Sequence, residues 1–242
     1  MSERQARAAS FGAVADAYER SRPEYPEDAV RWLEGDAPAD VVDLGAGTGK
    51  LTRGLVALGH RVTAVEPLPE MLEQLRRAVS EAVALSGGAE AIPRPDATAD
   101  VVVCAQAFHW FDQPIALREI ARVLRPGGRI GLVWNVRDET EAWVGELSDA
   151  MVGRTGIDRG AVEPIDASGL YGPVEHAVFS HVQDVGRDAL RELVLSRSFC
   201  AVLSEDERAP VLERVDALFD EHSHDGVLRL PYLAECFRAV RL

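Results

Sequence analysis

Hydrophobic residues in the first 135 positions gather into short continuous runs, with helical patterns between them. The clearest runs are 41–44, 61–65, 100–104 and 130–134, and a weaker one covers 82–85. These runs lack the alternation of apolar and polar residues that marks a half-exposed strand. They are typical of parallel strands buried on both faces. The pattern therefore predicts a central sheet of mostly parallel strands.

Helical spacing of apolar residues follows three of these runs. Residues 50–58 end at Gly59, which is a helix stop signal. Residues 71–79 and 115–124 carry apolar side chains three or four positions apart, and Arg125-Pro126-Gly127-Gly128 must break the second of these helices. Alternating strands and helices predict a doubly wound α/β fold with right-handed crossovers.

The second half of the chain has a different rhythm. One helix is predicted at 141–152, followed by a loop rich in Gly, Pro and Asp. Strands are predicted at 176–185 and 227–233, and helices at 188–198 and 205–222. We expect this half to extend the same sheet and to cover one of its edges with helices.

The first strand runs into a glycine-rich turn, Asp43-Leu44-Gly45-Ala46-Gly47-Thr48-Gly49, and then into a helix. Glycines let a ligand approach backbone atoms that a Cβ would block, and amide groups at the helix start face that ligand. A P-loop is excluded, because position 44 is leucine and Leu51 follows the lysine. A dinucleotide fingerprint has one more residue before its third glycine. The shorter spacing favours a ligand with a nucleoside and an amino acid but no phosphate.

An acidic residue stands where a ribose would be held. Glu66 lies 21 positions after Gly45, at the end of the second predicted strand. Its carboxylate could accept charge-assisted hydrogen bonds from both ribose hydroxyls. The alternative is a solvent-exposed strand end. Asp43 either orients the amides of the turn or acts as a simple cap, and the sequence leaves both readings open.

Composition narrows the class of protein. The 242 residues carry a net charge of −14, which argues against a general nucleic-acid binder, since that needs a basic footprint. The first ten residues lack the apolar run of a signal peptide, and no stretch approaches a membrane span. Three cysteines, Cys104, Cys200 and Cys236, lack metal-ligand spacing and are expected to be small buried thiols. A cytoplasmic protein without a metal site is expected.

These residues resemble the class I S-adenosylmethionine-dependent methyltransferases, especially the small-molecule type that includes trans-aconitate methyltransferase-like proteins. Further segments occur in the order that this family shows, and the match covers most of the chain. They are 41–49, 64–67 with Met71, 88–93, 100–104, 105–111 and 122–128. The resemblance implies a Rossmann-like sheet of seven strands, mostly parallel, whose last strand is antiparallel.

The resemblance also assigns cofactor contacts. Residues of the glycine turn would lie beside the amino-acid part of S-adenosylmethionine, and Glu66 would hold its ribose. Pro67 and Met71 would pack on adenine, Ala89 and Glu90 would lie near its exocyclic edge, and Ala105 and Gln106 would pass under the methionine portion. The residues assigned in the turn are Asp43, Gly45, Ala46, Gly47 and Gly49. Met71 is equally well explained as a core residue of its helix.

The segment 11–23 resembles the opening of this family, where a helical lid covers the cofactor. Tyr18 and Arg22 would contact the cofactor, because the planar guanidinium fork suits a methionine carboxylate. The alternative is an exposed amphipathic helix packed on the sheet edge. We expect one domain overall, with lid helices in 1–36, the cofactor-binding core in 37–135, and the rest of the sheet with substrate-covering helices in 136–242.

The acceptor side of the site is expected to follow the fourth and fifth strands. His109 is placed at the carboxyl edge of the sheet, where it could act as a general base, contact substrate or cofactor, or brace its loop. Trp110 and Trp134 would wall or contact the substrate. Methyl transfer itself requires mainly that the nucleophile be held close to the activated methyl and in line with the sulfur. A base is needed only when the nucleophile carries a proton of high pKa.

The predicted function is therefore transfer of a methyl group from S-adenosylmethionine, leaving S-adenosylhomocysteine, to a small molecule that accepts at a carboxylate, hydroxyl, amine or carbon atom. One alternative is a regulatory protein that binds the cofactor without turnover. A weaker alternative is a nicotinamide-dependent oxidoreductase. We expect a monomer or homodimer whose partner is a small-molecule substrate, not a nucleic acid or a membrane.

Overall fold

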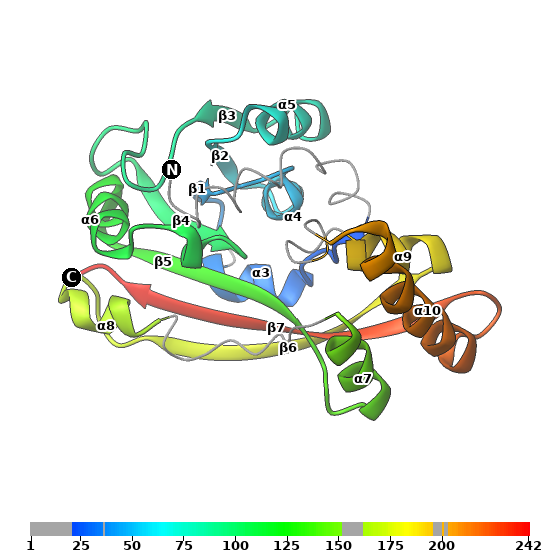
Figure 1. Ribbon diagram of the computed structural model, residues 1–242. Helices are drawn as coiled ribbons and strands as arrows, with labels where there is room; N and C mark the ends of the chain where they lie inside the picture. The colour runs from blue at the N-terminus through cyan, green and yellow to red at the C-terminus, as the bar shows by residue number, and fades with distance from the viewer. Residues whose placement is uncertain (1–20, 36, 152–161, 196–199, 201–202) are drawn as a thin grey trace. The chain divides into compact units, whose positions relative to one another are not determined.

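The computed structural model describes residues 21–35, 37–151, 162–195, 200 and 203–242. Its strands form one seven-stranded sheet in the order β3-β2-β1-β4-β5-β7-β6 (Figure 1). The strands are β1 (Asp40–Leu44), β2 (Arg61–Glu66), β3 (Val83–Ser86), β4 (Ala99–Ala105), β5 (Leu124–Arg137), β6 (Glu175–Val185) and β7 (Leu228–Val240). The helices are α3 (Glu27–Glu34), α4 (Lys50–Ala57), α5 (Pro69–Ala78), the short η2 (Phe108–Trp110), α6 (Gln113–Val123), α7 (Ala142–Ala150), α8 (Glu163–Ser168), α9 (Arg187–Leu195) and α10 (Glu205–His222).

Contacts group the chain into two compact units, which are described separately. Unit 1 comprises Met1–Glu24, Val136–Gly156 and Ser180–Leu233. Unit 2 comprises Tyr25–Asn135, Ile157–Phe179 and Ala234–Leu242. Unit 2 contains the glycine turn and the strands that the sequence predicts for the cofactor core.

Four neighbouring strand pairs of the sheet are parallel, as the continuous apolar runs predict. β1 pairs with β2 and with β4, β2 pairs with β3, and β4 pairs with β5. The chain moves outward from β1 to β3 and then returns to β4 on the other side of β1. The strand order thus reverses between β1 and β4, and in open α/β sheets ligands bind outside the carboxyl ends at such a point.

The last strand is antiparallel to its neighbour, as the family resemblance implies. Asp138 N–H, just after β5, donates to Pro231 O, whereas Arg241 N–H, just after β7, donates to Gly128 O. Residue numbers therefore rise along one strand as they fall along the other. The predicted class, a mostly parallel sheet of seven strands with an antiparallel last strand, is confirmed. β7 runs to Val240, which makes it longer than the predicted strand at 227–233.

The Arg125–Gly128 segment ends helix α6 as predicted, but it is not a separate turn. These residues belong to β5 and form an irregularity in its pairing with β4, where Leu124 pairs with Ala99 and Arg129 with Val101. Gly127 adopts a φ of +76°, and a Cβ at Gly128 would lie 2.8 Å from Asp100 O. The two glycines therefore let the chain bulge and still continue as a strand.

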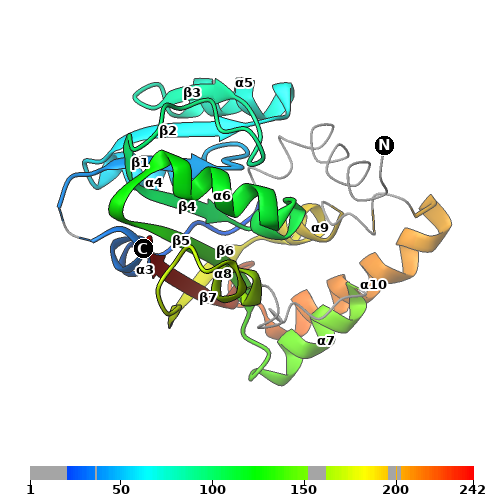
Figure 2. The ribbon, with the colours of Figure 1, turned by 90° about the vertical axis from the view of Figure 1, so that its left-hand side faces the viewer.

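The core of unit 2 is built where helices cover the parallel strands. α3 and α4 contribute Val30, Leu33, Leu51 and Leu55 to a buried cluster that also contains Val41 of β1. α5 packs on β2 and β3, and Figure 2 shows α6 in front of β4. Proline in the first turn of α5 and α6, and an Asp112 side chain that accepts from Ile115 N–H, favour helix initiation at these points.

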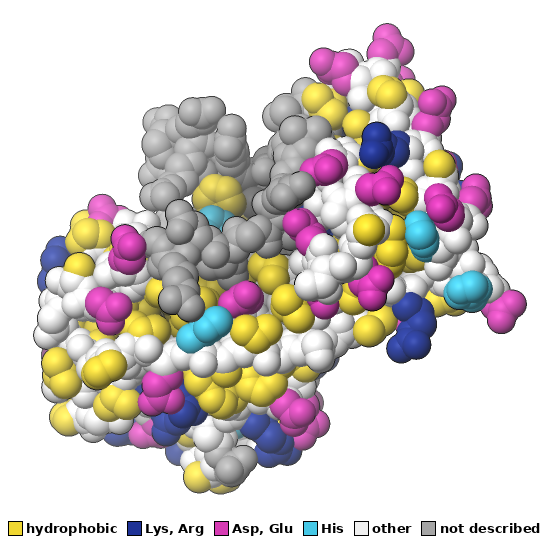
Figure 3. All heavy atoms as spheres, turned by 90° about the horizontal axis from the view of Figure 1, so that it is seen from below, with side chains coloured by type: hydrophobic (Ala, Val, Ile, Leu, Met, Phe, Trp, Pro, Cys, Tyr) yellow, Lys and Arg dark blue, Asp and Glu magenta, His cyan; other side chains and the backbone are white. Residues whose placement is uncertain are grey.

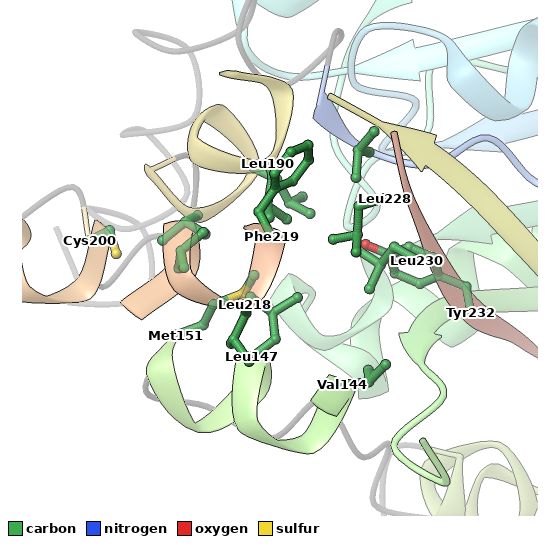
Figure 4. Close-up of a cluster of buried hydrophobic side chains, with 14 residues drawn as sticks. Val144, Leu147, Met151, Leu190, Cys200, Leu218, Phe219, Leu228, Leu230 and Tyr232 are labelled. Atoms are coloured by element: carbon green, nitrogen blue, oxygen red, sulfur yellow. The ribbon is translucent and has the colours of Figure 1, made fainter. Parts of the chain in front are cut away.

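The core of unit 1 lies between three helices and the first part of β7. α10 packs against α7 and α9, and side chains from all three meet Leu228, Leu230 and Tyr232 (Figure 4). α10 begins with a capping box in which Ser204 and Glu207 bond each other's backbone N–H groups. The predicted helix at 205–222 matches α10, and those at 141–152 and 188–198 match α7 and α9 to within a few residues.

Helix α8 was not predicted from the sequence. It has only six residues, carries Pro164 in its first turn and ends at Gly169, which has a φ of +67°. Those signals are equally typical of the Gly- and Pro-rich loop that the sequence predicts there. No helix in the described ranges is both long and apolar enough to cross a membrane.

Candidate functional site

The glycine turn is a tightly anchored connection between β1 and α4. Gly45, Gly47 and Gly49 have φ values of +72°, +57° and +93°, which other residues rarely adopt. The N–H groups of Gly45 and Ala46 both donate to Val65 O of β2, at 2.9 and 3.1 Å. A Cβ on Gly45 would lie 2.8 Å from the Ala107 Cβ atom. The turn is thus fixed against both neighbouring strands, with its backbone close to the loop that follows β4.

Glu66 holds the turn from the carboxyl end of β2. Gly47 N–H donates to its Oε2 atom and Leu68 N–H to its Oε1 atom, both at 2.9 Å. The residue is only 4% exposed, so the alternative of a solvated strand end is wrong. Burial raises the pKa of Glu66, while the two N–H bonds oppose that rise. Each carboxylate oxygen has a second lone pair, so the group could still accept from a ligand diol.

The hydrogen bonds that Asp43 accepts from the described residues do not come from the amides of the turn. Its Oδ2 atom accepts from Thr52 Oγ1 at 2.6 Å, in the first turn of α4. Burial raises the pKa of Asp43 to about 7, and the nearby Glu66 contributes to the rise. Two buried acids beside one another favour a ligand with positive charge, because such a ligand stabilises their ionised forms. A sulfonium cofactor with an amino group has this charge.

The residues expected around adenine differ in exposure. Met71 and Ala89 are buried, whereas Pro67 and Glu90 are exposed. The Met71 sulfur is the nearest atom to a Cβ built on Gly47, at 3.7 Å, so Met71 lies beside the turn as well as in the core of α5. Glu90 Oε1 accepts from Asp112 N–H at 2.8 Å, which ties this loop to the start of α6.

Gln106 braces the carboxyl ends of β4 and β5. Its backbone is in the left-handed region, with a φ of +55°. Its N–H donates to Val133 O, and its side-chain Nε2 donates to Asn135 O at 2.9 Å. Strained non-glycine residues persist only where the surroundings over-determine them, and they cluster at functional sites. Together with Ala105, Gln106 therefore forms a rigid edge next to the glycine turn.

The expected acceptor-side residues come together at this edge of unit 2. His109 and Trp110 lie in η2, directly after β4, and their rings are 4.7 Å apart. Trp134, near the end of β5, directs its indole Nε1 toward His109 Nδ1 at 3.5 Å. The Trp134 ring in turn meets Phe237 of β7 edge-to-face, at 5.9 Å. The structure thus brings together the three side chains assigned from sequence to the substrate.

Two other cofactor contacts are expected from the lid segment. Tyr18 lies outside the described residues, as does most of the expected lid at 1–36. Arg22 is a half-buried residue of unit 1, so its relation to the turn stays a prediction.

The sequence reasoning did not assign Thr52, which the structure places at the turn through its bond to Asp43. Phe111, which the sequence predicts as a wall of the pocket or a ring facing the sulfur, lies with its ring 3.4 Å from a Cβ built on Gly45. The role of Thr52 had no signal beyond its place one turn into the helix.

The cysteines and histidines provide no sign of a metal centre. Cys104, Cys200 and Cys236 are buried thiols, as predicted. Within the described ranges, no group of three or more His, Cys, Asp or Glu residues is arranged to hold a metal ion.

Comparisons with known proteins show that this chain is similar to methyltransferases. Residues 42–132 match the family model described as a methyltransferase domain. An uncharacterised methyltransferase of Mycobacterium tuberculosis is 46% identical over 237 residues, which cover 95% of each chain. A malonyl-[acyl-carrier protein] O-methyltransferase of Erwinia pyrifoliae is 36% identical over 131 residues, about half of each chain. A putative type II methyltransferase structure from Anaeromyxobacter dehalogenans has a TM-score of 0.64 at 26% identity and covers 91% of this chain and 97% of that chain.

The fold, the turn and these relatives converge on one cofactor. The buried acidic residues fit a positively charged ligand, and the glycines leave room for its approach to the backbone. The long match to a relative named as a methyltransferase supports the same assignment over nearly the whole chain. The chain belongs to the class I S-adenosylmethionine-dependent methyltransferases.

Proposed function

We propose that this enzyme methylates a small molecule bound beside the carboxyl ends of β4 and β5. The observation that carries the proposal is the convergence of His109, Trp110 and Trp134 next to the braced edge formed by Gln106. Aromatic walls with a few polar groups are typical of sites for small ligands. The Erwinia relative is named as an O-methyltransferase of a malonyl group, which supports oxygen among the possible acceptor atoms.

The residues of the site have mainly positioning roles. When bound, S-adenosylmethionine supplies a methyl group already activated by a positive sulfur. Glu66 would accept from the ribose hydroxyls, and its bond from Gly47 N–H helps to hold the turn in place. The rings of Trp110 and Trp134 flank His109 and would limit the space beside it. Holding the acceptor in line with the departing sulfur is the main catalytic task of such a site.

Charge supports a small-molecule partner over a nucleic acid. The chain carries a net charge of −14, and on the face shown in Figure 3 basic side chains are scattered and accompanied by acidic ones. Nucleic-acid binding needs a continuous basic footprint. We expect the protein to be a monomer or homodimer and to act in the cytoplasm.

A labelled-methyl assay tests this proposal. The protein would be incubated with methyl-labelled S-adenosylmethionine and a panel of carboxylic acids, phenols, alcohols, amines and activated carbon acids. Calorimetry with S-adenosylhomocysteine would measure cofactor binding separately. The proposal expects binding and label transfer to at least one class. Tight binding with no transfer to any class would instead favour a regulatory cofactor-binding protein. A thermal shift with NADH but not with S-adenosylhomocysteine would favour an oxidoreductase.

A further inference from the structure

The contact between Trp134 and His109 has a direction that determines which ring nitrogen of His109 carries a proton. An indole N–H can only donate a hydrogen bond. The nitrogen of His109 that it faces, Nδ1 at 3.5 Å, must therefore present its lone pair. In a neutral imidazole with an accepting Nδ1, the proton is on Nε2. The distance is long for a hydrogen bond, so the contact orients the ring more than it adds stability.

The orientation of Trp134 is itself constrained by neighbouring rings. Trp134 is only 5% exposed, and a buried indole N–H usually requires an acceptor. Its ring meets Phe237 edge-to-face, and Phe237 is stacked on His176 with ring centres 4.5 Å apart. His176 Nε2 lies 2.6 Å from Glu235 Oε2, on the neighbouring strand β7. This row of rings leaves the Trp134 indole little freedom to rotate away from His109.

Protonation of His109 would oppose this arrangement. A doubly protonated ring would place an N–H at Nδ1 directly against the N–H of Trp134, and two donors repel. A general base at this position would have to take its proton on Nε2, which already carries one in the favoured tautomer. The geometry is therefore suited to donating a hydrogen bond from Nε2 and unsuited to removing a proton from the acceptor.

We infer that Trp134 is a positioning residue that holds His109 as an Nε2–H donor, and that the enzyme accordingly methylates an acceptor that is already an oxyanion at neutral pH. This inference rests on the proposed function. In the reaction, the acceptor oxygen forms a bond to the methyl carbon as the carbon–sulfur bond breaks. The bonding pair goes to sulfur, and no proton is released. His109 Nε2–H would orient the oxyanion group, and a carboxylate is the simplest acceptor of this kind.

The tautomer can be measured without knowing the acceptor. Nitrogen-15 NMR of the histidine rings at pH 8, with S-adenosylhomocysteine present, distinguishes Nδ1–H from Nε2–H, and loss of a signal in His109→Gln assigns His109. We expect the Nε2–H form in the wild type and a mixture of both forms in Trp134→Phe, which keeps a ring but lacks the N–H. Trp143→Phe, on α7, removes an indole stacked on His222 instead and should leave the His109 signal unchanged. A wild-type Nδ1–H form would overturn the inference.

The acceptor class is tested with the same variants. Glutamine offers an amide N–H donor but cannot take up a proton, so His109→Gln should stay within about 3-fold of wild type, while His109→Ala should lose about 10- to 100-fold. Trp134→Phe should be intermediate, and His109→Gln should be insensitive to the added Trp134→Phe change. The labelled product should be an ester, which releases its label as methanol in alkali. An alkali-stable ether or amine product, with His109→Gln as inactive as His109→Ala, would overturn the inference. If cofactor binds but no acceptor class is labelled, the proposed function fails, whereas the NMR result still decides the role of Trp134.

Discussion

Buried acids stand at both edges of the parallel sheet in unit 2, but their polar neighbours differ. At the amino edge, Glu34 ends α3 with its side chain fully buried, and His60 Nε2 lies 2.9 Å from its Oε2 atom. His60 Nδ1 accepts from Ala39 N–H, so the neutral ring carries its proton on Nε2, but neither carboxyl oxygen of Glu34 has a hydrogen-bond partner among the described residues. At the carboxyl edge, Glu66 is held by backbone N–H groups of Gly47 and Leu68.

This difference separates a structural acid from the acid that we propose to bind the cofactor. Burial raises the pKa of Glu34 to about 8, which favours a neutral carboxylic acid beside a neutral His60, whose pKa burial lowers. Among the described residues, Glu66 is bonded by backbone donors, which favour its ionised form, and it stands beside the glycines of the turn. Similar burial therefore serves packing at one edge and, in the proposed function, cofactor binding at the other. Substitutions at the two edges should separate stability from affinity.

The largest expected effect is the loss of cofactor affinity in Glu66→Ala. The substitution removes the charged acceptor for two ribose hydroxyls, each bond contributing about 1.5–3 kcal/mol, so affinity should fall by roughly 100-fold or more. Calorimetry with S-adenosylhomocysteine measures this directly. Glu34→Gln is the control at the other edge and should bind within about 2-fold of wild type. Equal affinity of Glu66→Ala and wild type would refute the ribose assignment.

The second largest effect is expected in Glu34→Gln, whose free energy of unfolding should depend on pH differently from that of the wild type. The pKa of Glu34 is raised in the folded state from 4.5 to about 8. Its favourable contribution is therefore fully present below about pH 4.5 and is lost as the pH rises through about 8. Glutamine does not ionise, so the stability of Glu34→Gln relative to wild type should rise by about 2 kcal/mol between pH 6 and pH 9.

Denaturant unfolding at several pH values between 6 and 9 measures this change. Glu27→Gln, on the exposed face of the same helix, is the matched control and should follow the wild-type curve. Parallel curves for wild type and Glu34→Gln over this range would show that Glu34 is not neutral in the folded protein.

A smaller effect is expected in Gly47→Ala, which tests the turn itself. The left-handed φ of +57° should cost the variant about 1–2 kcal/mol of stability. The nearest described atom to the new Cβ is the Met71 sulfur at 3.7 Å, an ordinary contact, so the fold should survive. Cofactor affinity should fall about 10-fold, because the added methyl narrows the approach to the backbone.

Gly59→Ala separates the two contributions to that effect. Gly59 has a φ of +86°, and a Cβ there would meet no atom within 4 Å. It lies at the amino edge, just before β2, so its substitution should cause a similar loss of stability with unchanged affinity. Thermal unfolding and calorimetry would be applied to both variants. If both bind as wild type does, the glycine turn has only a structural role.

The carboxyl edge could be predicted from sequence better than the amino edge. Its glycines and Glu66 lie in one short stretch with fixed spacing, and local spacing is what a sequence displays. The Glu34–His60 pair joins residues 26 positions apart in a helix end and a loop, with no pattern to connect them. Likewise, nothing in the sequence shows that Trp134 faces His109, since their contact depends on how β4 and β5 pair. The fold class could be predicted from the periodicity of hydrophobic residues. The partners of polar side chains could not, because they depend on packing.

The smallest expected effect concerns Thr52→Val, which removes the hydroxyl that bonds Asp43 while keeping the side-chain shape. The pKa of Asp43 is raised to about 7 by burial, and its bonds from Thr52 oppose that rise. Removing the hydroxyl should raise this pKa further, so the loss should concern the ionised form of Asp43 and grow as the pH passes about 7. We expect roughly 1 kcal/mol at pH 8 and less at pH 5, measured by denaturant unfolding. Thr52→Ser keeps the donor and should follow the wild-type pH dependence. An equal loss in both variants at both pH values would show that Thr52 contributes through packing, and that Asp43 at the carboxyl edge is held as a neutral acid in the same way as Glu34.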